Sequence, residues 1–245
     1  MLRVSLQGAG VKILAFDTAT DDTVVAAADQ GRLVYERVLP PDDRHPVHGR
    51  ALLQMIEDAV SALGGWDQVE RIAVGIGPGI FTGIRIGVAT AAGLSASSGS
   101  TVVGIPTLAA LARSIGAETG DSLIVPLVDA RRGEVFGALC PAGGGGVGEP
   151  FTSSPEDLAE MLRNLPGGGA APRVAGPGAI RFRDELVRAG LEIEPAGSPV
   201  HKLGGSPFCE LGLAAETVGP ETLKPLYLRN PDAQLWLERD SNSSN

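Results

Sequence analysis

The residues best placed to do chemistry form a glycine-rich turn between an apolar run and a helical stretch. Residues 72–76 predict a buried strand, and Gly77, Gly79 and Gly83 follow it. Because a helix N-terminus presents free N–H groups, such a turn could hold a phosphate. The glycine spacing is one residue longer than the dinucleotide fingerprint, and no Gly-Lys-Ser/Thr follows. The spacing therefore favours a tight turn that lets the helix lie close to the sheet.

Two aspartates occupy equivalent positions in the two halves of the chain. Asp17 ends a predicted strand over residues 12–16, and Asp129 ends one over residues 122–128. A tight turn and a returning strand follow in each case, so the second half repeats the architecture of the first. Two such halves facing each other would form a cleft, and we expect both aspartates to point into it.

Metal, thiol and hydrolase chemistry find little support in the sequence. His45 and His48 are three residues apart at the start of a predicted helix, and His201 lies alone in a Gly/Pro loop. Cys140 and Cys209 have neither metal spacing nor a neighbouring histidine. No Gly-x-Ser-x-Gly motif occurs. We therefore expect no metal site, no disulfide and no nucleophilic residue.

Composition limits the classes of partner and compartment. The chain has 245 residues, of which 43% are hydrophobic and 20% charged, as in a globular protein with a large core. A net charge of −9 argues against this chain binding nucleic acid on its own. Two cysteines indicate a reducing compartment, so we expect a cytoplasmic protein. No apolar run would span a membrane, and residues 1–10 lack the apolar core of a signal peptide.

The predicted elements divide the chain into two α/β halves. The first half begins with three strands in close succession and continues as helix, strand, helix, strand, helix, which is the pattern of a ribonuclease-H-like domain. The second half starts again with a strand and its returning partner. The expected divisions are an extension over 1–11, a first domain over 12–116, a smaller second domain over 117–229 and a flexible tail over 230–245. Helices are expected over 47–63, 82–97, 106–115, 155–165, 179–189 and 207–218.

Two helices of the first half carry more apolar surface than one core needs. In residues 47–63 the apolar arc covers roughly 200° of the helical wheel, against about 100° for an ordinary core-facing helix. In residues 82–97, for which Thr82 is the expected N-cap, Gly83, Gly87 and Ala91 recur every four residues and permit close approach of another backbone. One hypothesis is deep burial within the domain. We favour the other, in which one face of each helix binds a partner.

At this point the sequence resembles the bacterial TsaB family, also called YeaZ. The resemblance rests on ILAFDTAT at residues 13–20, GPGIFTGIRIG at 77–87, DARRGEVF at 129–136 and PLYLR at 225–229. It extends from Lys12 to about Arg229, and the glycine motif with its following helix is its most specific part. Ile80 departs from the family pattern, which has a small polar residue there. That departure weakens a phosphate-binding role for the turn but not a packing role.

The resemblance implies an actin-like, sugar-kinase-like (ASKHA) fold of two ribonuclease-H-like halves. It implies a part in making threonylcarbamoyladenosine beside the tRNA anticodon, as a non-catalytic subunit with no activity alone. The paralogue TsaD would carry the metal, the nucleotide and the transferase chemistry, so this chain would need no cofactor of its own. TsaD would bind the helices of the first half, TsaE would join as an ATPase, and tRNA would be reached only through the complex. The same helices would form a homodimer in the absence of TsaD.

Two sets of site residues follow from these considerations. The first is the partner interface, with Leu53, Ile56, Val60, Ile84 and Val88 as expected exposed anchors. The full interface set comprises Leu52, Leu53, Ile56, Val60, Ile84, Gly87, Val88 and Ala91. The second set would serve the alternative function, a small actin-like ATPase or kinase, because aspartates at the strand ends of actin-like folds position magnesium and phosphates. That cleft set comprises Asp17, Thr18, Thr20, Gly77, Gly79, Asp129 and Arg131.

The cleft set has a weakness on the side of the first aspartate. The turn after Asp17 lacks glycine and carries Asp21 and Asp22, whose carboxylates repel phosphate. After Asp129, in contrast, Arg131 and Arg132 would attract it. We therefore expect weak affinity for ATP and no hydrolysis.

Overall fold

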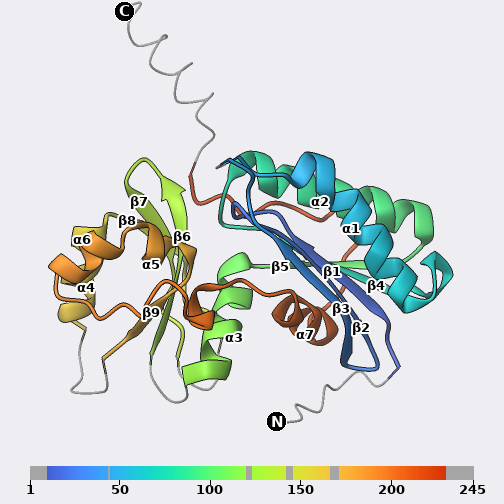
Figure 1. Cartoon of the computed structure of the whole chain (residues 1–245). Coiled ribbons are helices and arrows are strands. Elements are labelled where there is room, and N and C mark those ends of the chain that lie inside the picture. The colour runs from blue at the N-terminus through green and yellow to red at the C-terminus, as the bar shows by residue number, and fades with distance from the viewer. Residues whose placement is uncertain (1–9, 44, 120–122, 142–145, 166–170, 230–245) are drawn as a thin grey trace, which may run out of the picture.

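The computed structural model describes residues 10–43, 45–119, 123–141, 146–165 and 171–229 (Figure 1). Most of the expected extension over 1–11, the tail over 230–245 and parts of two glycine-rich breaks lie outside the described residues. No helix in the described part is long and apolar enough to cross a membrane.

The first half contains a five-stranded sheet in the order β3-β2-β1-β4-β5. β1 pairs antiparallel with β2 and parallel with β4, and β5 continues the parallel side. Every residue of β1 is buried, whereas the edge strand β3 is largely exposed, so the core is built around β1. The strands are β1 (Ile13–Asp17), β2 (Thr23–Asp29), β3 (Arg32–Leu39), β4 (Arg71–Gly75) and β5 (Thr101–Ile105).

Helices cover both faces of this sheet. α1 (His48–Leu63) and α2 (Phe81–Ser98) lie side by side on one face, where α1 packs on β1, β2 and β3, and α2 on β1, β4 and β5. α7 (Ser206–Ala214) covers the opposite face and α3 (Thr107–Thr119) lies between the two halves (Figure 1). The short helix η1 (Trp66–Gln68) follows α1. One outer layer of the molecule therefore consists of α1 and α2.

The second half repeats the start of the first with a smaller sheet in the order β8-β7-β6-β9. Its central strand β6 pairs antiparallel with β7 and parallel with β9, just as β1 pairs with β2 and β4. The strands are β6 (Ile124–Arg131), β7 (Glu134–Gly137), β8 (Phe151–Ser153) and β9 (Arg173–Ala175). The helices are α4 (Pro155–Arg163), α5 (Pro177–Arg181), α6 (Arg183–Arg188) and η3 (Pro199–His201). The predicted fold class, two ribonuclease-H-like halves in an actin-like arrangement, is confirmed.

Several predicted helix limits differ from the structure, and three of the differences have a clear structural reason. α2 begins at Phe81 with Ile80 as its N-cap, so Thr82 lies within the helix and does not cap it. The helix expected over 179–189 is divided in two at Phe182, whose backbone leaves the helical region while its ring enters the core. α7 ends before Val218, because the Val218 N–H donates to the Val102 carbonyl and the chain becomes extended.

The domain boundary predicted at residue 116 does not separate the hydrophobic cores of the two halves. α7 comes late in the chain, yet Phe208 and Cys209 belong to the same core cluster as Ile13 of β1. Arg71 of β4 fixes the end of this helix, since its Nη1 donates to the carbonyls of Gly212 and Leu213 at 2.8 and 3.1 Å. The expected second domain, 117–229, therefore includes a helix that completes the first.

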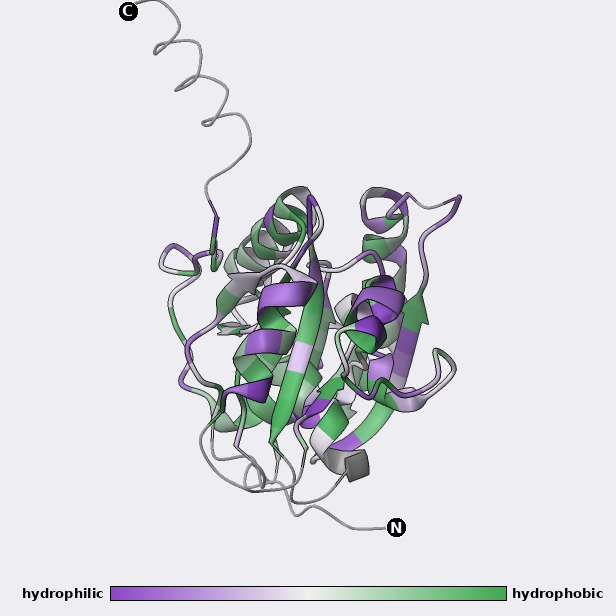
Figure 2. Ribbon diagram, turned by 90° about the vertical axis from the view of Figure 1, so that its left-hand side faces the viewer, coloured by the Kyte–Doolittle hydropathy of each residue, from purple (hydrophilic) through white to green (hydrophobic). Residues whose placement is uncertain are grey.

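The hydropathy of the ribbon agrees with this layering. In Figure 2 the strands are mainly green, whereas helices alternate green and purple along their length. This pattern is expected where each helix packs one face on a sheet and presents the other outward.

Candidate functional site

Asp17 lies at the end of β1 but is completely buried, with none of its surface exposed. Its Oδ1 accepts a hydrogen bond from the Ala19 N–H at 2.8 Å, and its Oδ2 accepts one from Thr107 Oγ1 at 2.8 Å. Thr107 Oγ1 in turn accepts from the Gly77 N–H at 3.2 Å. Burial raises the pKa of Asp17 to about 6, against the lowering effect of these hydrogen bonds. The carboxylate thus ties β1 to the glycine turn, and the expectation that it points into a cleft is wrong.

The glycine turn packs against the turn that follows Asp17. A Cβ on Gly79 would lie 2.1 Å from the Ala19 carbonyl oxygen, and a Cβ on Gly83 would lie 1.9 Å from that of Thr18. The Ile80 N–H donates to Ala19 at 2.7 Å, and Thr18 Oγ1 donates to the Gly83 carbonyl at 2.7 Å. The small residues of α2 therefore do admit another backbone, as predicted, but it is the β1–β2 turn of the same chain.

The remaining cleft residues of the first half are also engaged within the fold. Thr18 and Thr20 are buried, and a Cβ on Gly77 would lie 2.7 Å from the Ile84 side chain. The Thr20 carbonyl accepts from His48 Nε2 at 3.1 Å, while His48 Nδ1 accepts from Thr23 Oγ1 at 2.8 Å. Burial lowers the pKa of His48, which favours the neutral ring that this pattern requires. These groups hold the β1–β2 turn against α1 and α2.

Asp129 and Arg131 form the counterpart in the second half. The Asp129 carboxylate accepts from the Arg131 backbone N–H at 2.7 Å and pairs with the Arg131 guanidinium at 3.0 Å. The same guanidinium reaches Asp21 of the β1–β2 turn at 2.6 Å. Arg131 therefore joins the two halves by ion pairs. Asp129 and Arg131, both predicted for the cleft set, do lie together. Sequence reasoning did not recognise Asp21 as the partner of Arg131, or Thr107 and Gly75 as neighbours of Asp17.

A segment near the C-terminus also joins the two halves. The Leu226 N–H donates to the Ile76 carbonyl at 2.8 Å, and Tyr227 stacks on Phe81 with ring centroids 4.9 Å apart. Arg229 then pairs with Glu134 and donates to the Ala130 carbonyl at the β6–β7 hairpin. The residues 225–229, singled out in the sequence, thus cross from the glycine turn to the second half.

The predicted interface anchors differ sharply in exposure. Ile56, Val60, Ile84 and Val88 are only 1, 2, 1 and 8% exposed, so the expectation that they are exposed anchors is wrong. Leu52, Gly87 and Ala91 are buried as well. They face inward because the apolar arcs of α1 and α2 are used by the sheet and by the β1–β2 turn. Leu53, in contrast, is 63% exposed, more than any other large hydrophobic side chain among the described residues.

The remaining histidines and cysteines have internal roles. His201 Nδ1 accepts from the Gly176 N–H at 3.2 Å, and its Nε2 donates to the Glu194 carbonyl at 3.1 Å. His45 lies at the surface, with its Nδ1 3.0 Å from the Asp43 carbonyl. Cys140 and Cys209 are buried free thiols whose pKa values burial raises to about 11 and about 12. In the described part of the chain no three His, Cys, Asp or Glu side chains are grouped to hold a metal ion.

Comparisons with known proteins show which sequences this chain resembles. The profile of a family described as "TsaD: tRNA N6-adenosine threonylcarbamoyltransferase" matches residues 38–187. The tRNA threonylcarbamoyladenosine biosynthesis protein TsaB of Escherichia coli is 29% identical over 90% of this chain and 95% of its own. An uncharacterized protein of Mycobacterium tuberculosis is 32% identical over 91% of this chain and 93% of its own.

A solved structure agrees with the sequence relatives. The structure of YeaZ from Pseudomonas aeruginosa superposes with a TM-score of 0.72 and 26% identity, covering 89% of this chain and all of the other. The similarity therefore extends over both halves of the fold.

Proposed function

Because the chain belongs to the TsaB (YeaZ) family and acts in tRNA threonylcarbamoyladenosine biosynthesis, within the TsaD-containing complex, we propose that it is the non-catalytic subunit that binds and activates TsaD. The outer face of α1 and α2 is the proposed binding surface. Its central feature is Leu53, a large apolar side chain that is 63% exposed on an otherwise polar helix face. A contiguous apolar surface, rather than one exposed leucine, marks a binding site, so the neighbouring helix must contribute as well.

The neighbouring face of α2 supports the same proposal. Ala89, Gly93 and Ala96 are exposed at spacings of three and four residues, so they lie on one side of the helix. A Cβ on Gly93 would meet no atom within 4 Å. Small side chains allow a partner helix to approach closely, and the adjacent helix α1 adds the exposed apolar side chain of Leu53. We propose that a helix of TsaD packs along this surface and that a second copy of the chain occupies it when TsaD is absent.

The remaining partner assignments follow from charge and from the cleft. We propose that TsaE joins the complex formed with TsaD and that tRNA is bound mainly by the partners, because this chain has a net charge of −9. We also propose that ATP and metal belong to the partner proteins. Asp17 is buried and hydrogen-bonded, and Asp129 is paired with Arg131, so neither carboxylate is free to hold magnesium without rearrangement.

Replacing Leu53 with arginine is the experiment that tests the proposed surface. We expect Leu53→Arg to weaken binding to TsaD about 30-fold or more, the effect of losing one interface hot spot. The modification product, formed from ATP, bicarbonate, threonine and tRNA with all partners present, should fall in parallel. The matched control is Val187→Arg on α6, since Val187 is also an exposed aliphatic residue, at 44%, but lies in the second half.

The two variants separate the possible outcomes. Both should unfold like the wild-type protein, because neither side chain belongs to a core cluster. If Val187→Arg weakens binding and Leu53→Arg does not, TsaD binds elsewhere. If product forms equally well when this chain is omitted altogether, the subunit role itself is wrong.

ATP titration tests the alternative of a small actin-like ATPase or kinase. We expect calorimetry to detect at most weak binding of ATP with magnesium, and no phosphate release by the isolated chain. Turnover that is lost in Asp129→Ala would contradict the non-catalytic proposal and return attention to the cleft.

A further inference from the structure

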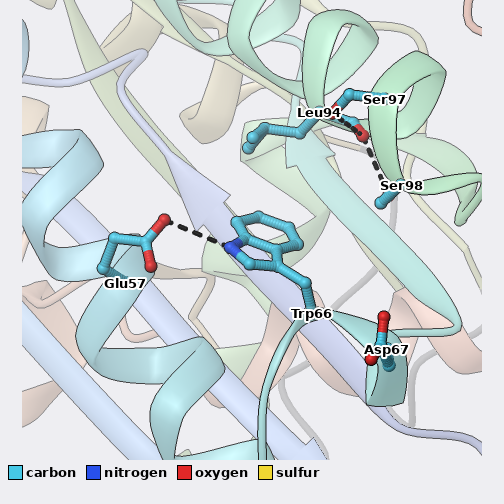
Figure 3. Close-up of a pocket in the computed structure, with 6 residues that line it drawn as sticks. All are labelled: Glu57, Trp66, Asp67, Leu94, Ser97 and Ser98. Atoms are coloured by element: carbon cyan, nitrogen blue, oxygen red, sulfur yellow. Dashed lines mark hydrogen bonds between the residues drawn. The ribbon is translucent and has the colours of Figure 1, made fainter.

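A pocket of about 350 Å³ lies between the middle of α1, η1 and the C-terminal end of α2 (Figure 3). The half-buried indole of Trp66 occupies its centre, with Glu57 on one side and Asp67 on the other (Figure 3). The Trp66 Nε1–H donates to Glu57 Oε1 at 3.2 Å and so fixes both the ring and the carboxylate. The pocket is lined by Glu57, Trp66, Asp67, Leu94, Ser97 and Ser98.

The pocket combines several sources of negative potential. Two of its lining residues are carboxylates, and it also contains the last turn of α2, whose carbonyl end carries a partial negative charge. The last turn of α2 has no basic side chain. At the end of α1, in contrast, Lys12 Nζ donates to the Leu63 carbonyl at 2.9 Å. Among the residues that the structure describes, the α2 end is therefore the one without such a cation.

No cation among the described residues neutralises the two carboxylates. Neither Glu57 nor Asp67 forms an ion pair with a described Lys, Arg or His, whereas Asp58, on the same helix as Glu57, pairs with Arg37. A phosphate or a nucleotide would be repelled by these charges. The pocket is not a dedicated Ca²⁺ site, because Ca²⁺ takes about six to eight oxygen ligands and no group of three potential metal-binding side chains occurs in the described part of the chain. The chemistry favours an organic cation.

We propose that this pocket receives an arginine side chain from the protein that binds the α1–α2 surface. A planar guanidinium can stack on the Trp66 ring and donate to carboxylates on both sides of it, whereas a lysine ammonium would satisfy only one side well. The Ser97 hydroxyl donates to the Leu94 carbonyl at 3.0 Å, which leaves its lone pairs available to accept from the guanidinium. Ser98 Oγ, in contrast, already accepts from the Ser100 N–H at 3.2 Å. The inference rests on the proposed function, because Glu57 lies one helical turn beyond Leu53 on the outer face of α1.

A small-molecule titration tests the pocket independently of any partner. The chain has two tryptophans, so Trp236→Phe leaves Trp66 as the only indole reporter. We expect N-acetyl-arginine amide to change the Trp66 fluorescence in a saturable manner. N-acetyl-citrulline amide has the same shape without the charge and should produce no saturable change at equal ionic strength. Loss of the response in Glu57→Gln/Asp67→Asn would assign it to these carboxylates. An equal response to both compounds, or a response that survives the double substitution, would overturn the inference.

Binding to TsaD tests the same pocket in the complex. We expect Glu57→Gln/Asp67→Asn to weaken TsaD binding about tenfold at low salt and to reduce its salt dependence, because an ion pair is lost. The result is interpreted beside Leu53→Arg. If Leu53→Arg abolishes binding while the double variant binds with unchanged affinity and salt dependence, the surface is correct and the arginine pocket is wrong. If Leu53→Arg has no effect, the proposed surface fails, and the fluorescence titration alone decides the pocket.

Discussion

Gly83→Ala is expected to destabilise the fold by about 3 kcal/mol or more, while Gly93→Ala, ten residues further along the same helix, is expected to stabilise it by up to about 1 kcal/mol. A Cβ at Gly83 would lie 1.9 Å from the carbonyl oxygen of Thr18, and backbone cannot yield as a flexible side chain can. At Gly93 a Cβ would meet nothing within 4 Å, so only the higher helix propensity of alanine remains. Urea unfolding of the two variants and the wild-type protein measures both changes.

This pair of substitutions controls for helix propensity, since both replace a glycine of α2 by alanine. Equal free energies of unfolding for the two variants would mean that the β1–β2 turn does not lie against Gly83. Gly93→Ala also probes the outer face. Its stability should rise, and if a partner helix packs there closely, its affinity for TsaD should fall.

Asp17 is expected to make the free energy of unfolding fall as pH rises from about 4 to about 7. Burial raises its pKa from 3.8 to about 6 in the folded protein. Below pH 3.8 the group is protonated in both states and imposes no penalty. Above pH 6 it is ionised in both states, and folding must then bury a charge, at a cost of about 3 kcal/mol. The stabilisation present at low pH is therefore lost across this window.

Comparison with Asp17→Asn isolates this contribution from the other titrating groups. Relative to wild type, the asparagine variant should gain about 3 kcal/mol between pH 4 and pH 7, whatever constant loss its altered hydrogen bond to Thr107 causes. Asp184→Asn, which removes an exposed carboxylate on α6 instead of a buried one, serves as the control substitution. If the difference between wild type and Asp17→Asn stays constant with pH, the carboxyl group is not buried as described.

Much of the candidate site could be anticipated from local sequence. The apolar runs, the strand-ending aspartates and the glycine turn predicted the ribonuclease-H-like repeat, because alternation and turn residues act over a few positions. The packing role of Gly79 and Gly83 was likewise the favoured interpretation of their spacing, and the 2.1 and 1.9 Å approaches at these positions confirm it. Thr107 and Asp21 were missed, because they meet Asp17 and Arg131 only through contacts distant in sequence.

Local sequence could not predict which side chains of the outer helices α1 and α2 are buried. A helical wheel shows that Leu52, Leu53 and Ile56 are apolar, but it does not show which neighbours will cover them. In the folded chain Leu52 and Ile56 enter the core, and Leu53 remains outside. The excess of apolar residues on α2 is used by the β1–β2 turn, which the wheel does not include.

Short-range pattern thus established the type and order of the elements, the duplicated architecture and the family resemblance, because these depend on residues that are neighbours along the chain. Long-range packing settled the rest. It buried Asp17, directed α7 from the end of the chain onto the first sheet, and left Leu53 and the Trp66 pocket on the same outer layer. Such features depend on which surfaces remain after the two halves have folded together, and that outcome is a property of the assembled fold.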